Sequence, residues 1–154
     1  MAASTDILIG DPEGQRLLIQ PLGRRHPGLF DYWDGNWIAC EVQLSAGGFR
    51  GSFHADLRSE EFHAFLEELE SLGQTLEGSA AFSTIDGQLA CSLTGDGNGH
   101  VHVEGEALDE PGTGNRLHFR FDIDQTYLPQ ISRAVESLLA AFPVTGSRED
   151  TPAS

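Results

Sequence analysis

The sequence predicts an α+β domain in which two amphipathic helices cover an antiparallel sheet of about six to eight strands. Apolar and polar residues alternate along most of the chain, which is typical of strands that bury one face. Two stretches, roughly 59–72 and 126–142, instead repeat apolar residues at helical spacing. The 154 residues are 39% hydrophobic and include nine phenylalanines, enough for a substantial core. We expect one domain over residues 1–144 and a polar, disordered tail over residues 145–154.

The chain opens with a predicted hairpin. Residues 6–9 and 15–20 alternate as strands do, and they flank the turn sequence Asp11-Pro12-Glu13-Gly14. A loop rich in Pro, Gly and Arg follows over residues 21–30. A second hairpin turns at Ser45-Ala46-Gly47-Gly48, and a four-residue turn there would pair Cys40 with Phe53 and Val42 with Gly51.

The spacing predicts the first helix over residues 59–72. Ser59 is a candidate N-cap, and Glu60 and Glu61 lie in the first turn, where the helix dipole favours acids. Gly73 is a candidate stop signal. The apolar face consists of Phe62, Phe65, Leu66, Leu69 and Leu72.

A four-strand meander is predicted after this helix. The two-residue turn Asp86-Gly87 places Phe82 opposite Cys91 and Ala80 opposite Leu93. The glycine-rich loop 95–99 would place Cys91 opposite Val103 and Leu93 opposite Val101. A third loop near Gly112 sets Val103 opposite Phe121. Every turn keeps one apolar face, and this agreement supports the meander.

The second helix is predicted over residues 126–142. Asp124 or Thr126 can cap its start, and Pro143 ends it. Its apolar stripe consists of Leu128, Ile131, Val135, Leu138, Leu139 and Phe142.

Charge is the strongest deviation in the composition. The net charge is -15, and all nine basic residues are arginine. This balance argues against binding to nucleic acid or to an anionic membrane, and it favours a basic partner. No signal peptide or membrane-spanning stretch is visible, so we expect a cytoplasmic protein. Two cysteines on apolar strand positions, Cys40 and Cys91, are expected to be buried free thiols unless their strands adjoin.

A histidine pair is the main candidate for metal chemistry. His100 and His102 share one face of a predicted strand. The predicted register pairs each outer-face base with an acid, which accounts for both histidines without a metal: His100 with Asp124, His102 with Asp122, Glu104 with Arg120, and Glu106 with His118. A metal-dependent enzyme or a small-molecule-binding module that uses His100 and His102 remains the alternative. The chain contains no G-x-S-x-G, H-E-x-x-H or phosphate-loop motif and no lysine.

Two features are candidates for partner binding. The first is Asp31-Tyr32-Trp33-Asp34-Gly35-Asn36-Trp37, which we call the aromatic heptad and which holds both tryptophans. It suits either a plug at the end of the sheet or an interface anchor. The second is the first helix, where Glu60, Glu67, Glu68 and Glu70 lack basic residues to offset them. These glutamates form either a solvated face or a docking surface for a basic partner.

The sequence resembles the WapI family of bacterial immunity proteins over roughly residues 15–140. The resemblance rests on the aromatic heptad, on Gly47-Gly48-Phe49-Arg50-Gly51 and on the acidic helix with Phe62, Phe65 and Leu69. It extends through Gly99-His100-Val101-His102-Val103 and Asp124-Gln125-Thr126-Tyr127-Leu128. The resemblance implies a non-enzymatic protein that neutralises a toxin and needs no cofactor. We therefore expect a cognate basic toxin as partner, bound through Asp31, Tyr32, Trp33, Asp34 and Trp37 and through the helix glutamates. Homodimer formation through an edge strand stays open.

Overall fold

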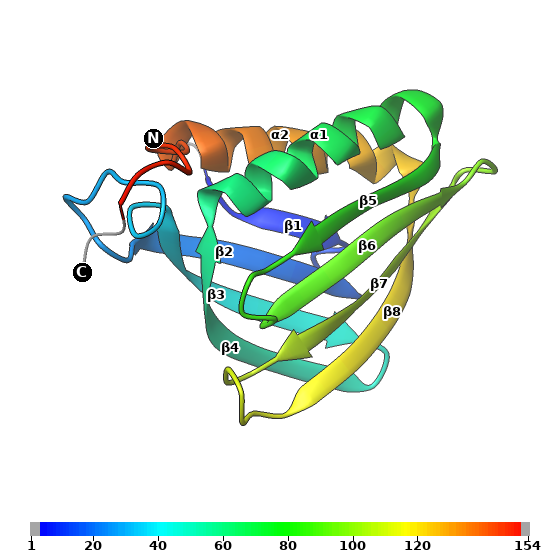
Figure 1. Ribbon diagram of the computed structural model, residues 1–154. Helices are drawn as coiled ribbons and strands as arrows, with labels where there is room; N and C mark the ends of the chain where they lie inside the picture. Colours follow the sequence, from blue (N-terminus) through cyan, green and yellow to red (C-terminus); the bar gives the residue numbers. More distant parts are fainter. Residues whose placement is uncertain (1–3, 152–154) are drawn as a thin grey trace.

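The computed structural model describes residues 4–151 and contains two four-stranded antiparallel sheets and two long helices (Figure 1). The first sheet consists of β1 (Ile7–Gly10), β2 (Arg16–Arg24), β3 (Trp37–Ala46) and β4 (Phe49–Arg58). The second consists of β5 (Glu77–Ser83), β6 (Leu89–Asp96), β7 (His100–Leu108) and β8 (Arg116–Asp124). Helix α1 (Ser59–Thr75) joins the sheets, and a short 3-10 helix, η1 (Gln125–Tyr127), leads into α2 (Leu128–Ala141). The predicted α+β class, with two helices and antiparallel strands, is confirmed.

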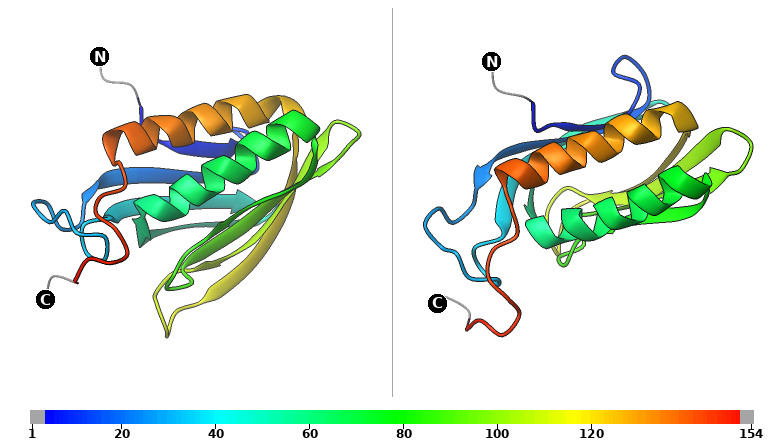
Figure 2. Two further views of the ribbon diagram at one scale, coloured as in Figure 1. Left: turned by 45° about the horizontal axis from the view of Figure 1, so that its top comes forward. Right: turned by 90° about the horizontal axis from the view of Figure 1, so that it is seen from above.

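The element order repeats, because each four-strand meander is followed by one helix. The two helices lie side by side over the sheets (Figure 2). Helix α1 packs against β5 and α2, and α2 also packs against β1. Apolar residues from both sheets and both helices form one buried cluster, which includes Ile9, Val42, Phe65, Val103 and Ile131. Both sheets therefore share a single core beneath the helix pair.

Helix α1 differs from the prediction at both ends. Its N-cap is Arg58 rather than Ser59, and the Glu61 carboxylate accepts the Arg58 backbone N–H at 2.9 Å. The helix continues past Gly73 to Thr75, and Leu76 ends it in a left-handed conformation with φ of 59°. The Leu76 N–H then donates to the Leu72 carbonyl oxygen. One glycine inside a helix costs only about 1 kcal/mol, and Leu76, which ends the helix beyond this glycine, packs against the core.

The second hairpin is shifted by two residues from the prediction. Cys40 lies opposite Ala55 and Val42 opposite Phe53, because the turn is the two-residue Gly47-Gly48 rather than four residues. Gly47 has φ of 58°, which suits a tight hairpin turn. A two-residue shift keeps the apolar face inside, so the alternation of the sequence could not detect it.

The meander confirms two predicted registers and corrects a third. Phe82 lies opposite Cys91, and Val103 lies opposite Phe121, as expected. Between β6 and β7, however, Cys91 lies opposite Gly105 and not opposite Val103. The loop is centred one residue further along than the prediction assumed, which moves every pair by two positions. The four predicted outer-face pairs between β7 and β8 all hold as register partners.

Side chains bond to backbone groups on two outer strands of the sheets. The Glu68 carboxylate accepts the Ala81 N–H of β5 at 3.3 Å. Gln88 is buried, and its amide donates to the His54 oxygen of β4 at 3.0 Å and to the Leu108 oxygen of β7 at 3.1 Å. The Gln88 contacts join the two sheets, and the contacts on the edge strands β4 and β5 occupy groups that would otherwise be open to another strand.

No helix within residues 4–151 is both long enough and apolar enough to cross a membrane.

We predict that Gly105→Ala destabilises the protein by about 1–3 kcal/mol, because overpacking strains a filled core. A Cβ at Gly105 would lie 2.2 Å from the Ala90 oxygen and 2.8 Å from the Phe119 ring. Gly51 is the matched control, since a Cβ there meets nothing within 4 Å. Urea unfolding should place Gly51→Ala within about 0.5 kcal/mol of the native chain. Equal stabilities for the two variants would contradict the register at Gly105.

Candidate partner-binding surface

The aromatic heptad forms a compact turn between β2 and β3. Asn36 is fully buried and Tyr32 is 9% exposed, whereas Asp31, Trp33, Asp34 and Trp37 are half-buried. The Gly35 N–H donates to the Asp31 oxygen at 3.0 Å. A Cβ at Gly35 would lie 2.6 Å from that same oxygen, so the turn requires glycine.

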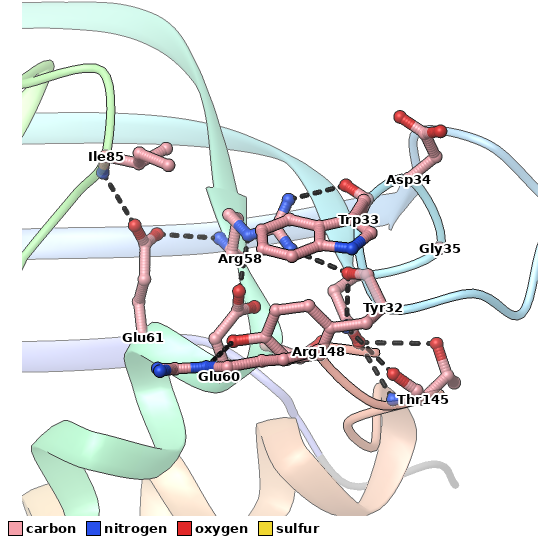
Figure 3. Close-up of polar contacts among 12 residues, drawn as sticks. Tyr32, Trp33, Asp34, Gly35, Arg58, Glu60, Glu61, Ile85, Thr145 and Arg148 are labelled. Carbon is pink, nitrogen blue, oxygen red and sulfur yellow. Dashed lines mark hydrogen bonds and ion pairs between the residues drawn. The ribbon is translucent and has the colours of Figure 1, made fainter. Parts of the chain in front are cut away.

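Arg58, at the end of β4, holds the heptad in place (Figure 3). Its side chain is only 4% exposed. The guanidinium donates to the backbone carbonyl oxygens of Tyr32 at 2.6 Å and Trp33 at 2.7 Å. It also donates to the Glu60 carboxylate at 2.5 Å. It also lies over two rings, 4.8 Å from the Trp37 centroid and 5.5 Å from the Tyr32 centroid. The aromatic side chains of the heptad therefore serve largely to bury one arginine.

The segment after α2 contacts the heptad through residues 145–150, within the part of the chain for which the sequence predicts a disordered tail. The Trp33 indole N–H donates to the Asp150 backbone oxygen at 2.8 Å, and the Asp150 carboxylate accepts the Tyr32 N–H at 3.1 Å. Thr145 exchanges hydrogen bonds with the Asn36 amide at 2.9 and 3.1 Å. The polar residues of this segment thus satisfy buried groups of the heptad. Residues 152–154 of the predicted tail lie outside the described residues.

Glu61 links the two sheets at the start of α1 (Figure 3). One carboxylate oxygen accepts the Arg58 N–H, and the other accepts the Ile85 N–H of the β5–β6 loop at 2.7 Å. Burial raises the pKa of Glu61 to about 7, and the nearby Glu60 acts in the same direction. The two backbone donors and the Arg58 charge oppose this shift without cancelling it.

The remaining glutamates of α1 are exposed. Glu67 pairs with His63 at 3.1 Å, and Glu68 reaches β5 through the contact with Ala81. The Glu70 carboxylate makes no hydrogen bond or ion pair within residues 4–151, and α1 carries no Lys or Arg. Of the four predicted helix contacts, Glu60 is thus engaged by Arg58, while the other three present negative charge to solvent.

Exposed apolar side chains next to the heptad were not predicted. Phe30 is 74% exposed and directly precedes the heptad, and Leu22 is 65% exposed near the end of β2. Leu29 and Val144 are partly exposed nearby, and Arg24 connects the two segments by donating to the Pro143 oxygen at 2.6 Å. The sequence did offer a signal for these exposed residues: Leu22, Leu29 and Phe30 fall in residues 21–30, where apolar and polar residues do not alternate. Exposed apolar side chains often mark an interaction site where they gather.

The histidine pair lies on the exposed outer face of β7. His102 forms a hydrogen bond with Asp122, and His100 lies 3.7 Å from Asp96. Within residues 4–151 no three His, Cys, Asp or Glu side chains are grouped to hold a metal. Cys40 and Cys91 are buried free thiols, as predicted, and burial raises the pKa of each to about 12.

Replacement of Arg58 tests the role of this residue in packing. We expect Arg58→Lys to lower the free energy of unfolding by about 2–4 kcal/mol, because lysine cannot reproduce the planar fork and stacking. Arg50→Lys on the exposed part of the same strand should change it by less than about 0.5 kcal/mol. Similar losses in both variants, measured by urea unfolding, would show that the guanidinium contacts contribute little.

The titration of Glu61 is directly measurable. Its folded pKa lies above the ordinary 4.5, so this carboxyl favours folding below pH 4.5, and the contribution is lost as pH rises through about 7. A carbon-13 NMR titration should give a carboxyl midpoint near 7, assigned by loss of the signal in Glu61→Gln. The native chain should also lose more stability than Glu61→Gln between pH 5 and 8. A midpoint near 4.5 would show that the two backbone donors and the Arg58 charge cancel the effect of burial on this pKa.

Comparison with known proteins identifies the family. The solved structures that resemble this chain include a chain from the crystal structures of Trypanosoma brucei MRP1/MRP2 and one from the CdiA-CT/CdiI toxin and immunity complex of Enterobacter cloacae. The first is 10% identical with a TM-score of 0.46, covering 90% of this chain and 84% of that chain. The second is 12% identical with a TM-score of 0.42, covering 77% and 97%. Such distant likeness says nothing about function.

A search of curated proteins gives no match. The family model for the immunity protein WapI-like family matches residues 7–143, which include both sheets and both helices. This chain therefore belongs to the immunity protein WapI-like family.

Proposed function

We propose that this protein is a non-catalytic immunity protein that acts inside the cell by binding a cognate basic toxin. The observation that carries the proposal is the surface of α1, where Glu67, Glu68 and Glu70 are exposed and no Lys or Arg is present. A protein of net charge -15 attracts a basic partner over long range, and this attraction raises the association rate. Membership of an immunity family supports a partner of that kind.

The exposed apolar residues beside the heptad supply the second part of the proposed interface. Charged rims steer partners, but buried apolar and aromatic anchors contribute most of the affinity. Phe30 is the most exposed large apolar residue within residues 4–151, and Trp33 is half-buried beside Asp34. In this proposal Asp31, Tyr32 and Trp37 support the surface from below, while Trp33, Asp34 and Phe30 touch the toxin.

Co-purification tests the function itself. A toxin domain encoded beside the gene should form a stable complex with this protein at low salt, and the complex should abolish toxin activity in a cell-free assay. Absence of a complex at low salt, with both proteins folded, would overturn the proposal.

Charge reversal tests the surface. Glu67→Lys combined with Glu68→Lys should lower the association rate about tenfold at low salt and change the dissociation rate by less than about threefold. Glu13→Lys combined with Glu110→Lys is the control, since it makes the same change in net charge in two exposed hairpin loops. Stopped-flow kinetics would separate the two pairs. Equal slowing by both would assign the effect to overall charge and remove α1 from the interface.

A further inference from the structure

The C-terminal half of α1 and the N-terminal end of α2 enclose a groove. Both ends lie at the same end of the helix pair (Figure 2). The cavity has a volume of about 360 Å³. Leu76 is the partly exposed apolar residue of its lining, while Leu69 and Leu128 border it from the core at 0% and 2% exposure, and Glu70 and Gln125 lie among the polar lining residues. At about 30 Å³ for each water, the space equals roughly a dozen waters, or one long side chain with several waters.

The electrostatics of the groove favour a cation. Glu70 lines it and has no ion pair or hydrogen bond within residues 4–151. The last turn of α1 contains no basic residue, so the negative end of its dipole is not offset. At the opposite wall, the Asp124 carboxylate accepts the Thr126 N–H and offsets the positive end of η1 and α2. Pro129 in the first turn of α2 removes one N–H donor that an anion would need.

We infer that this groove receives one long basic side chain, arginine or lysine, from the partner protein. The aliphatic part of that side chain packs against Leu76, and its charged end reaches Glu70. The inference rests on the proposed function, because it assigns a specific contact to the same basic toxin. It places this contact at the end of α1 opposite the aromatic heptad, so the partner spans the length of the helix.

Gly73 provides a variant that blocks the groove without changing its charge. Gly73 lines the cavity, and a Cβ there would meet nothing within 4 Å. Leucine at this position fills the space, while alanine leaves it open. Both replacements favour the helix over glycine, so neither is expected to unfold the protein.

A small probe tests the groove without the toxin. We would titrate the labelled protein with N-acetyl-arginine methylamide at low salt and follow amide shifts by NMR. Saturable shifts should concentrate at Leu69, Leu76 and Gln125. The affinity should fall about three- to fivefold in Glu70→Gln and disappear in Gly73→Leu. Gly73→Ala and Glu136→Gln should bind as the native chain does, and the neutral N-acetyl-norleucine methylamide should bind more weakly. Shifts spread over all acidic residues, or equal binding of the neutral probe, would overturn the inference.

Toxin binding separates this inference from the proposed function. In the complex, Gly73→Leu should raise the dissociation rate about tenfold relative to Gly73→Ala. An unchanged rate with an intact complex would overturn the groove and leave the immunity function standing. Failure of the native chain to bind any neighbouring toxin would overturn the proposed function. If the arginine probe also fails to saturate the groove, both proposals fall. If the probe still saturates it, the groove binds a basic side chain but not that of a toxin.

Discussion

Burial of the Arg58 guanidinium is the constraint on which this end of the molecule depends. A cation that is 4% exposed needs partners for its donors and a polarisable surface for its faces. The heptad provides two backbone oxygens and two aromatic rings, and α1 provides Glu60. One side chain thereby joins the end of the first sheet, the loop before it and the start of the helix that leads to the second sheet. The mixture of aromatic and polar residues in the heptad follows from this requirement.

The same arrangement divides the negative charge of α1. The first two glutamates are engaged, one by the guanidinium and the other by two backbone N–H groups. The later glutamates face solvent, and Glu70 borders the groove between the helices. The N-terminal end of α1 therefore stabilises the fold, whereas its middle and C-terminal end supply the charge that the proposed function needs. This division gives the binding surface a rigid support.

Much of the fold follows from local patterns in the sequence. Two kinds of feature could not be predicted: contacts between residues far apart in the sequence, and strand registers that differ by two residues. Alternation identifies which face of a strand is buried, but a two-residue slip leaves that face unchanged. The predicted pairings of Cys40 with Phe53 and of Cys91 with Val103 were therefore wrong. The contacts of Asp150 with Tyr32 and Trp33 join residues more than a hundred positions apart, and a polar tail gives no local signal for them. The glutamates of α1 were found from sequence because charge is visible there. The sequence did not indicate which of these glutamates are engaged and which face solvent, because that depends on contacts with Arg58 and with the β5–β6 loop.

The central claim is that surplus negative surface on α1 brings this protein to a basic partner. The most direct measurement is the association rate with the cognate toxin between about 20 and 500 mM salt, where screening lengths fall from roughly 20 Å to a few ångströms. We expect the association rate to fall steeply with rising salt while the dissociation rate stays nearly constant. An association rate that does not change with salt would contradict the central claim.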